Sequence, residues 1–144
     1  MSSDAIDAFL RSHKAGVLSL TDGLTAYGIP LAYFYDDRYI YLTLGRSGRK
    51  MKYVNPGGSV SFTVFDIADG FGSPGKTGWT SVICEGSLEH LSDAEEITRA
   101  VRAGERHMGM SEGTWEDLLQ MTLRAPEHSS FWRIYPTRIG GRTV

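Results

Sequence analysis

Short hydrophobic repeats of two kinds run along the chain and predict a mixture of helices and strands. From Ser3 onward, apolar residues recur at intervals of three and four (Ile6, Phe9, Leu10), which predicts a short amphipathic helix with Ser3 as its cap. Runs rich in β-branched, leucine and aromatic residues then predict strands over residues 15–20, 29–35 and 39–44, separated by turn signals. The second and third of these strands predict a hairpin.

Further strands and helices alternate through the rest of the chain. From Ser59 to Phe65 polar and apolar residues alternate, so one face of this strand joins the core and the other faces water or a polar ligand. Similar patterns predict strands over 80–88 and 130–139. Helices are predicted over 47–54, from the capping box Ser92-Asp93-Ala94-Glu95, and over 112–123.

This order of elements is typical of the α+β class with a mostly antiparallel sheet. Five or six short strands in one small domain usually curl into a barrel. The chain has 144 residues, which is one domain's worth of sequence, so residues 1–144 are expected to form a single domain.

Composition narrows the class of protein. Lys and Arg number 15 against 17 Asp and Glu, a net charge of −2, which argues against a nucleic-acid partner. No apolar run is long enough for a membrane span and no leader is visible, so we expect a cytoplasmic protein without a membrane partner. Cys84 is a lone cysteine, and the four histidines lack a second ligand at short spacing, so no metal site is predicted.

A glycine-rich stretch from Asp69 to Gly78 matches two phosphate-binding patterns literally. Gly70, Gly72 and Gly75 fit the dinucleotide pattern, and Gly70 with Gly75-Lys76-Thr77 fits the P-loop pattern. Both motifs work because the loop leads into a helix whose amides hold the phosphate. Strand sequence follows here instead, which favours a glycine-rich connection, with a role as a lid left open.

A basic segment, residues 45–52, gives a stronger indication of a phosphate site than the glycine-rich stretch does. Residues 45–52 carry four basic side chains and no acid, at the start of a predicted helix where the helix dipole disfavours cations. A bound anion would reverse that cost, and the Ser47 hydroxyl with Arg49 or Lys50 would form a phosphate cradle. A solvated basic turn accounts for the segment equally well.

Other polar and aromatic groups point less clearly to chemistry. Strand aromatics more often fill a core than flank a flat ligand: Tyr33, Tyr35, Tyr39, Tyr41, Trp79 and Trp132. No nucleophile elbow is present, and the carboxylates between Glu85 and Glu96 are explained by a solvated helix start. No catalytic residue is assigned.

The ordered set of strands around the basic segment resembles a known family. Residues 28–37 resemble the proline-containing strand and acidic turn of the FMN-binding split-barrel proteins related to pyridoxamine 5′-phosphate oxidase, particularly their small nitroimidazole-reductase-like branch. Residues 39–50 resemble the strand that leads into the phosphate-binding turn of this family. The strands at 59–65 and 81–86 and the last strand, from Trp132 to Arg142, follow in the same order.

The resemblance implies a six-stranded split barrel with short flanking helices that forms a homodimer and holds FMN at the subunit interface. It places the phosphate on Arg46, Ser47, Arg49 and Lys50. It places the flavin ring against Pro30, Leu31 and Ala32, against Leu42, Thr43 and Leu44, and near Ser61. Trp79, Ser81 and Trp132 would complete the pocket, some of them from the partner subunit. The implied activity is that of a flavin oxidoreductase on a small-molecule substrate.

Two departures from the family pattern argue against particular activities of the family. Thr43 and Leu44 stand where the nitroimidazole-reductase-like branch often has a histidine, which argues against nitro reduction. The segment from Arg138 to Arg142 has no histidine, which argues against oxidation of pyridoxamine phosphate. A flavin or haem carrier or sensor without turnover, and a deazaflavin-dependent reductase, are the alternatives.

Overall fold

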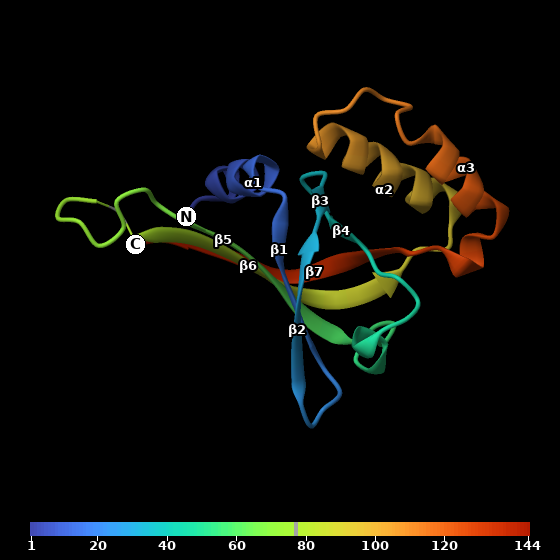
Figure 1. Cartoon of the computed structure of the whole chain (residues 1–144), viewed down its shortest axis with the longest axis horizontal. Helices are drawn as coiled ribbons and strands as arrows, with labels where there is room; N and C mark the ends of the chain where they lie inside the picture. The colour runs from blue at the N-terminus through green and yellow to red at the C-terminus, as the bar shows by residue number, and fades with distance from the viewer. Residues whose placement is uncertain (77) are drawn as a thin grey trace.

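One antiparallel sheet curls back on itself and carries three helices on its sides (Figure 1). The structure is a computed structural model that describes residues 1–76 and 78–144. Within these residues seven strands follow the spatial order β2-β1-β5-β6-β7-β4-β3. Their bounds are β1 Ala15–Thr21, β2 Ala26–Ala32, β3 Phe34–Tyr35, β4 Ile40–Thr43, β5 Ser59–Ile67, β6 Trp79–His90 and β7 Phe131–Thr143.

The α+β class and the mostly antiparallel sheet are confirmed, whereas the six-strand count is wrong. The sheet is a curled half-barrel of seven strands, in which β2 at one edge also contacts β4 near the other. Pro30 lies on β2, an edge strand, where its missing N–H interrupts no ladder.

The extra strand arises because the predicted strand over 29–35 is two strands. β2 pairs along its length with β1, from Ala26↔Thr21 to Ala32↔Ala15. The β1–β2 ladder ends at Tyr33, whose N–H still donates to the carbonyl oxygen of Lys14 in the same register (3.1 Å) and whose buried hydroxyl donates to that of Leu10 (2.7 Å). Only the two residues of β3 remain to pair with β4, so the predicted hairpin is much shorter than expected.

The helices lie close to their predicted positions, but their ends differ. α1 (Ser3–Ser12) is capped by Ser2 rather than Ser3, and α2 (Ala94–His107) is capped by Asp93 rather than by Ser92 of the predicted box. α3 (Glu116–Arg124) begins four residues later than the helix predicted over 112–123. The helix predicted over 47–54 is a single 3-10 turn, Arg49–Lys52, and a second such turn spans Pro126–His128.

Two hydrophobic clusters hold the sheet and helices together. The first fills the inside of the curl, where Leu18, Phe62, Leu88 and Ile134 are fully buried. The second lies between α2, α3 and the β3–β4 edge and is built around Ile97, Val101, Tyr41 and Phe131. On β5, Val60, Phe62 and Val64 face inward as their alternation predicts, so the intervening polar residues face outward.

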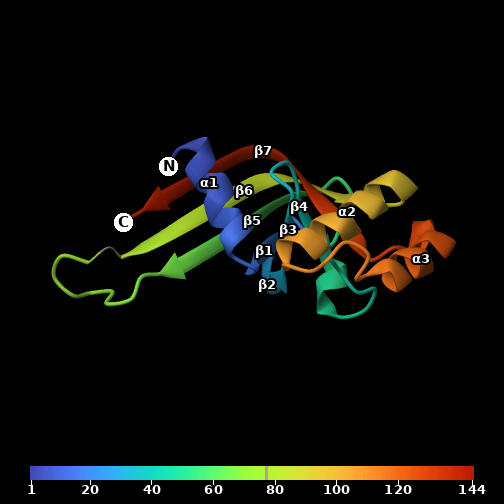
Figure 2. The ribbon, with the colours of Figure 1, turned by 90° about the horizontal axis from the view of Figure 1, so that it is seen from above.

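β5 and β6 form a long hairpin beside β7, and the segment that connects them extends beyond the end of β7, as Figure 2 shows. We call residues 65–81 of this hairpin the arm. Its glycine-rich loop runs from strand to strand, so the helix that a P-loop needs does not follow it; Thr77 of that motif lies outside the described residues. No helix of residues 1–76 and 78–144 is long and apolar enough to cross a bilayer.

Candidate functional site

One broad surface of the sheet carries small and polar side chains that face outward. Because antiparallel partners share a face, Val17 and Ser19 of β1 lie beside Pro30 and Gly28 of β2 and beside Thr63 and Ser61 of β5. The same face continues across β5 and β6 through Phe65, Ser81 and Ile83. We call this surface, formed by the residues named in this paragraph, the open face. The small side chains of Ser19, Gly28 and Ser61 allow a flat group to approach the backbone, whereas Phe65 and Ile83 are large exposed apolar groups.

The basic turn, residues 45–52, lies directly after β4. Leu44 anchors it by donating its N–H to the carbonyl oxygen of Ser130 (2.8 Å), and Gly48 adopts a φ of 104°, which favours glycine. The Lys50 ammonium folds back and donates to the carbonyl oxygen of Ser47 (2.8 Å), while the Arg49 guanidinium lies 5.6 Å from the Tyr27 ring centre. The turn is therefore held in shape by its own side chains.

The charges of the basic turn, and not a helix dipole, make it suitable for an anion. A four-residue 3-10 turn has no helix dipole of consequence, so the predicted helix is wrong and the dipole gives no reason to expect an anion here. The cations remain: within the described residues, Arg46, Arg49, Lys50 and Lys52 form no ion pair with a carboxylate. An anion held here would be bound by side chains.

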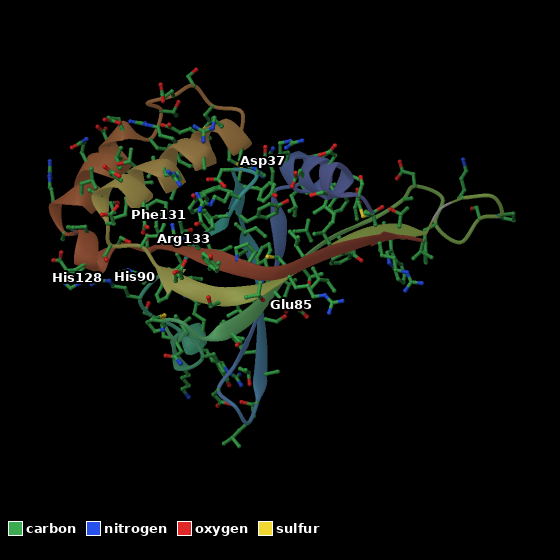
Figure 3. The ribbon with its side chains drawn as sticks, turned by 180° about the vertical axis from the view of Figure 1, so that it is seen from behind. Asp37, Glu85, His90, His128, Phe131 and Arg133 are labelled. Carbon is green, nitrogen blue, oxygen red and sulfur yellow. The ribbon has the colours of Figure 1, made fainter. Side chains whose placement is uncertain are left out.

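Ser61, Trp79 and Ser81 are brought to connected grooves on the open face. A groove of about 500 Å³ runs along β6 and β7, with Trp79 and Ser81 beside Arg138, Gly140 and Arg142. It adjoins a groove of about 380 Å³ that contains Ser61 and Ser19, and Glu85 lines both. Figure 3 shows Glu85 near the middle of the sheet.

Trp132 does not line the groove that contains Trp79. Its side chain is only 8% exposed and packs against His90, with ring centres 4.9 Å apart, on the core side of the sheet. There it lines a hollow of about 260 Å³ together with Leu44 and Arg46. His90, at the end of the sheet nearest α3 (Figure 3), donates from Nε2 to the carbonyl oxygen of Ser129.

The residues that the family resemblance places against the flavin ring lie in two different environments. Pro30, Ala32 and Thr43 are exposed, whereas Leu42 and Leu44 are buried in the core and Leu31 packs against it. The leucines therefore offer a ligand their backbone only.

Most of the strand aromatics belong to the core. Tyr33, Tyr35, Tyr39, Tyr41 and Trp132 are buried, and Trp79 is 43% exposed. Burial raises the pKa of the Tyr41 phenol and, to about 11, that of the Cys84 thiol, so neither group ionises near neutral pH.

Two pairs of residues at the candidate site were not predicted from the sequence. Arg138 and Arg142 reach the groove of Trp79 and Ser81 because β7 pairs with β6 in the register Ser81↔Arg142 and Glu85↔Arg138. The even spacing of Arg138, Gly140 and Arg142 signals a shared face, but not which strand lies beside it. Tyr27 and Tyr53, which stack 5.0 Å apart beside the basic turn, had no local signal.

Solved structures with the same fold have been described as flavin-binding and drug-resistance proteins. The FAD-binding protein of Mycobacterium smegmatis has a TM-score of 0.71 at 17% identity, over 100% of this chain and 97% of that one. A candidate 5-nitroimidazole resistance protein of Bacteroides thetaiotaomicron has a TM-score of 0.76 at 19% identity, over 99% and 84%. An FAD-binding protein of Mesorhizobium loti has a TM-score of 0.63 at 24% identity, over 99% and 93%. These identities establish the shared fold alone.

Comparison with family models is more specific. No curated protein matches the sequence. The family model for pyridoxamine 5′-phosphate oxidase, in contrast, matches residues 2–143, nearly the whole chain. Together with the curled antiparallel sheet and the basic turn after β4, this match confirms the resemblance drawn from the sequence. The chain belongs to the pyridoxamine 5′-phosphate oxidase family.

Proposed function

We propose that this protein is a flavoprotein that binds FMN and passes hydride or electrons between the flavin and a small molecule. The observation that carries the proposal is the basic turn, where four cations without an ion-pair partner in the described residues stand at the end of a strand in a flavin-related fold. A phosphate dianion supplies the missing negative charge. The flavin, when bound, supplies the redox chemistry itself.

The chain's own residues would bind and orient the cofactor. Arg46, Ser47, Arg49 and Lys50 would hold the phosphate, the last with an ammonium already folded over the turn. Pro30 and Ala32 present the outward face of an edge strand, and Thr43 is exposed at the end of β4. A flat ring can reach these positions because Pro30, Ala32 and Thr43 are all exposed.

We also propose that two copies pair through the open face and enclose the cofactor between them. The supporting observation is apolar exposure: Phe65, Trp79 and Ile83 are 55%, 43% and 46% exposed on one continuous surface. Clusters of exposed apolar residues mark interaction sites. Trp79 and Ser81 would then complete the pocket of the second copy, whereas Trp132 stays beside the basic turn of its own chain. Size-exclusion chromatography with light scattering tests this, and a monomer at micromolar concentration would contradict it.

The cofactor proposal is tested by removing the phosphate contacts. Replacing Arg49 and Lys50 together by alanine should weaken FMN binding by about 100-fold or more, since each charged hydrogen bond contributes about 1.5–3 kcal/mol. Riboflavin, which lacks the phosphate, should lose little. Lys76→Ala removes a cation from the arm loop and is the control. Equal losses for FMN and riboflavin would place the phosphate elsewhere.

Mass spectrometry of the ligand released on denaturation identifies the cofactor and separates FMN from a deazaflavin or haem. FAD needs its own comparison, because two of the similar structures are named as FAD-binding proteins. A protein that is colourless and gains no thermal stability with excess FMN or FAD would overturn the proposal.

A second candidate function is a flavin carrier or sensor without turnover. It is favoured by the placement of the buried titratable groups, because Tyr33, Tyr41 and Cys84 lie in the core and not on the open face. Steady-state oxidation of a reduced nicotinamide with an artificial electron acceptor distinguishes the two functions. Turnover above that of the same concentration of unbound flavin supports an enzyme.

A further inference from the structure

Gly140, on β7, is a glycine that the fold itself does not require. Its φ lies outside the left-handed region, and a Cβ there would meet no atom within 4 Å beyond its chain neighbours, in the part of the chain that the structure describes. The adjacent Gly141 differs, because a Cβ there would lie 2.6 Å from the Met1 sulfur and 3.2 Å from Ile6. A glycine inside a strand weakens it and often marks a close approach of another backbone or a ligand. The glycine at position 140 therefore indicates an approach from outside the chain.

Gly140 forms a gap in the outward surface of β6 and β7, directly beside an exposed apolar side chain. It pairs with Ile83 across the two strands, so both residues face the groove of about 500 Å³. The Ile83 side chain is 46% exposed. An exposed isoleucine beside an open gap gives this surface a knob and a hole at the same height along the strands.

Two opposite charges adjoin this knob and hole. The next outward pair along the strands is Glu85↔Arg138, and both side chains are exposed. They are direct cross-strand neighbours, yet neither forms an ion pair with any residue that the structure describes. Both charges are therefore available to a second molecule.

A second copy of the chain fits this surface, because each feature lies beside its own complement. A two-fold axis that runs along the strands, midway between β6 and β7, places β6 of each copy over β7 of the other. Ile83 of each copy then lies over Gly140 of the other, and Glu85 lies over Arg138. An isologous interface requires this self-complementarity. Aligned sheets pack about 10 Å apart, which leaves room for an isoleucine above a glycine.

We propose that two copies dock through β6 and β7 about this axis, with Ile83 of each chain seated over Gly140 of the other and Glu85 paired with Arg138. The inference rests on the proposed function, because it takes the pairing through the open face and specifies its contacts. β1 lies two strands away from β6, and β2 lies beyond it. The docked strands and the flavin ring proposed near Pro30 therefore use different residues.

Charge reversal tests the register of this contact. Glu85→Arg and Arg138→Glu should each weaken self-association by about 100-fold or more, because each brings like charges together twice in the homodimer. Mixed in equal amounts, the two variants should form a heterodimer about as tight as the unaltered homodimer, because both of its contacts join opposite charges. Native mass spectrometry separates the three species, and sedimentation equilibrium measures their affinities. Variant homodimers as tight as the unaltered protein, or no preference for the mixed pair, would overturn the inference.

Gly140→Leu tests the hole. The fold has room for the side chain, so circular dichroism should be unchanged while self-association weakens by about tenfold or more. Thr143→Leu, at an exposed position on the opposite face of β7, is the matched control and should remain dimeric.

The outcomes separate this contact from the proposals on which it rests. If Gly140→Leu loses flavin binding but stays dimeric, the groove holds a ligand instead of a second chain, and the inference is wrong. A dimer that none of these variants weakens would overturn this contact and leave the flavin proposal standing. An unaltered protein that is monomeric at micromolar concentration would refute both this contact and the proposed pairing.

Discussion

Replacing Gly104 by alanine sets two opposing effects against each other. In a helix interior alanine is favoured over glycine by about 0.8–1.0 kcal/mol, so an isolated α2 would gain stability. In the folded protein a Cβ at this position would overlap the ring of Trp115 and lie 3.0 Å from Phe34 Cδ2. Overpacking costs about 1–3 kcal/mol, and contact with two rings places the cost in the upper part of this range. We expect a net loss of about 1–2 kcal/mol.

The backbone of Trp115 is held close to α2, which limits how far the residue can move away from the new methyl group. Its backbone N–H donates to the buried Glu105 carboxylate (2.7 Å), which also accepts from Arg102. For a domain of this size, a loss of about 1–2 kcal/mol should lower the melting temperature by about 3–7 °C. In a double-mutant cycle, Trp115→Leu should relieve much of the penalty of Gly104→Ala. A melting temperature equal to or above that of the unaltered protein would refute this account of the α2–α3 contact.

Three further predictions concern the core and a histidine. His107 donates from Nε2 to the carbonyl oxygen of His13 (2.6 Å) and accepts the Tyr35 N–H at Nδ1, and burial lowers its pKa below 6.5. The unfolded chain therefore takes up this proton first, so stability should be level above about pH 6.5 and fall as the pH drops towards the folded pKa. Urea unfolding should show a shallower fall for His107→Gln, and identical pH profiles would contradict the assignment. The Cys84 thiol, with its pKa raised to about 11 by burial, should react with a thiol reagent only slowly until urea unfolds the protein; rapid labelling of the folded state would count against its burial. Phe62→Ala should cost about 3–5 kcal/mol in unfolding free energy, while Phe65→Ala on the exposed face should cost far less.

Elements with a strong local signal were predictable from the sequence. The alternation of Val60, Phe62 and Val64 with polar residues leaves only one register that buries the apolar side, and β5 adopts it. The basic segment is visible in the sequence because it has four cations and no acid between them, but its role as a phosphate site stays a prediction. Cap positions were wrong by one residue where two capping residues adjoin, as at Ser2 and Ser3.

The features that depend on distant contacts were not predictable. Nothing around Tyr33 signals the end of a strand, yet the next two residues, Phe34 and Tyr35, pair with β4 instead of β1. The single turn at Arg49–Lys52 has the sequence of a longer helix, but it begins after Gly48, whose φ is 104°, and ends at Tyr53, before the Asn55-Pro56 stop signal. The meeting of Ser81 with Arg142 depends on a β6–β7 register that includes a bulge at Glu85 and Gly86.

The positions of the helices on the sheet explain why the same surface should bind both the cofactor and a second copy of the chain. α1 packs against the inner side of β7, where a Cβ on Gly141 would lie 3.2 Å from Ile6, and α2 with α3 covers the β3–β4 edge. The helices leave the open face uncovered, and its small side chains on β1 and β2 let a flat ring approach but cannot surround it. A second chain would supply the missing wall, so each chain's affinity for flavin and for its copy would be thermodynamically linked.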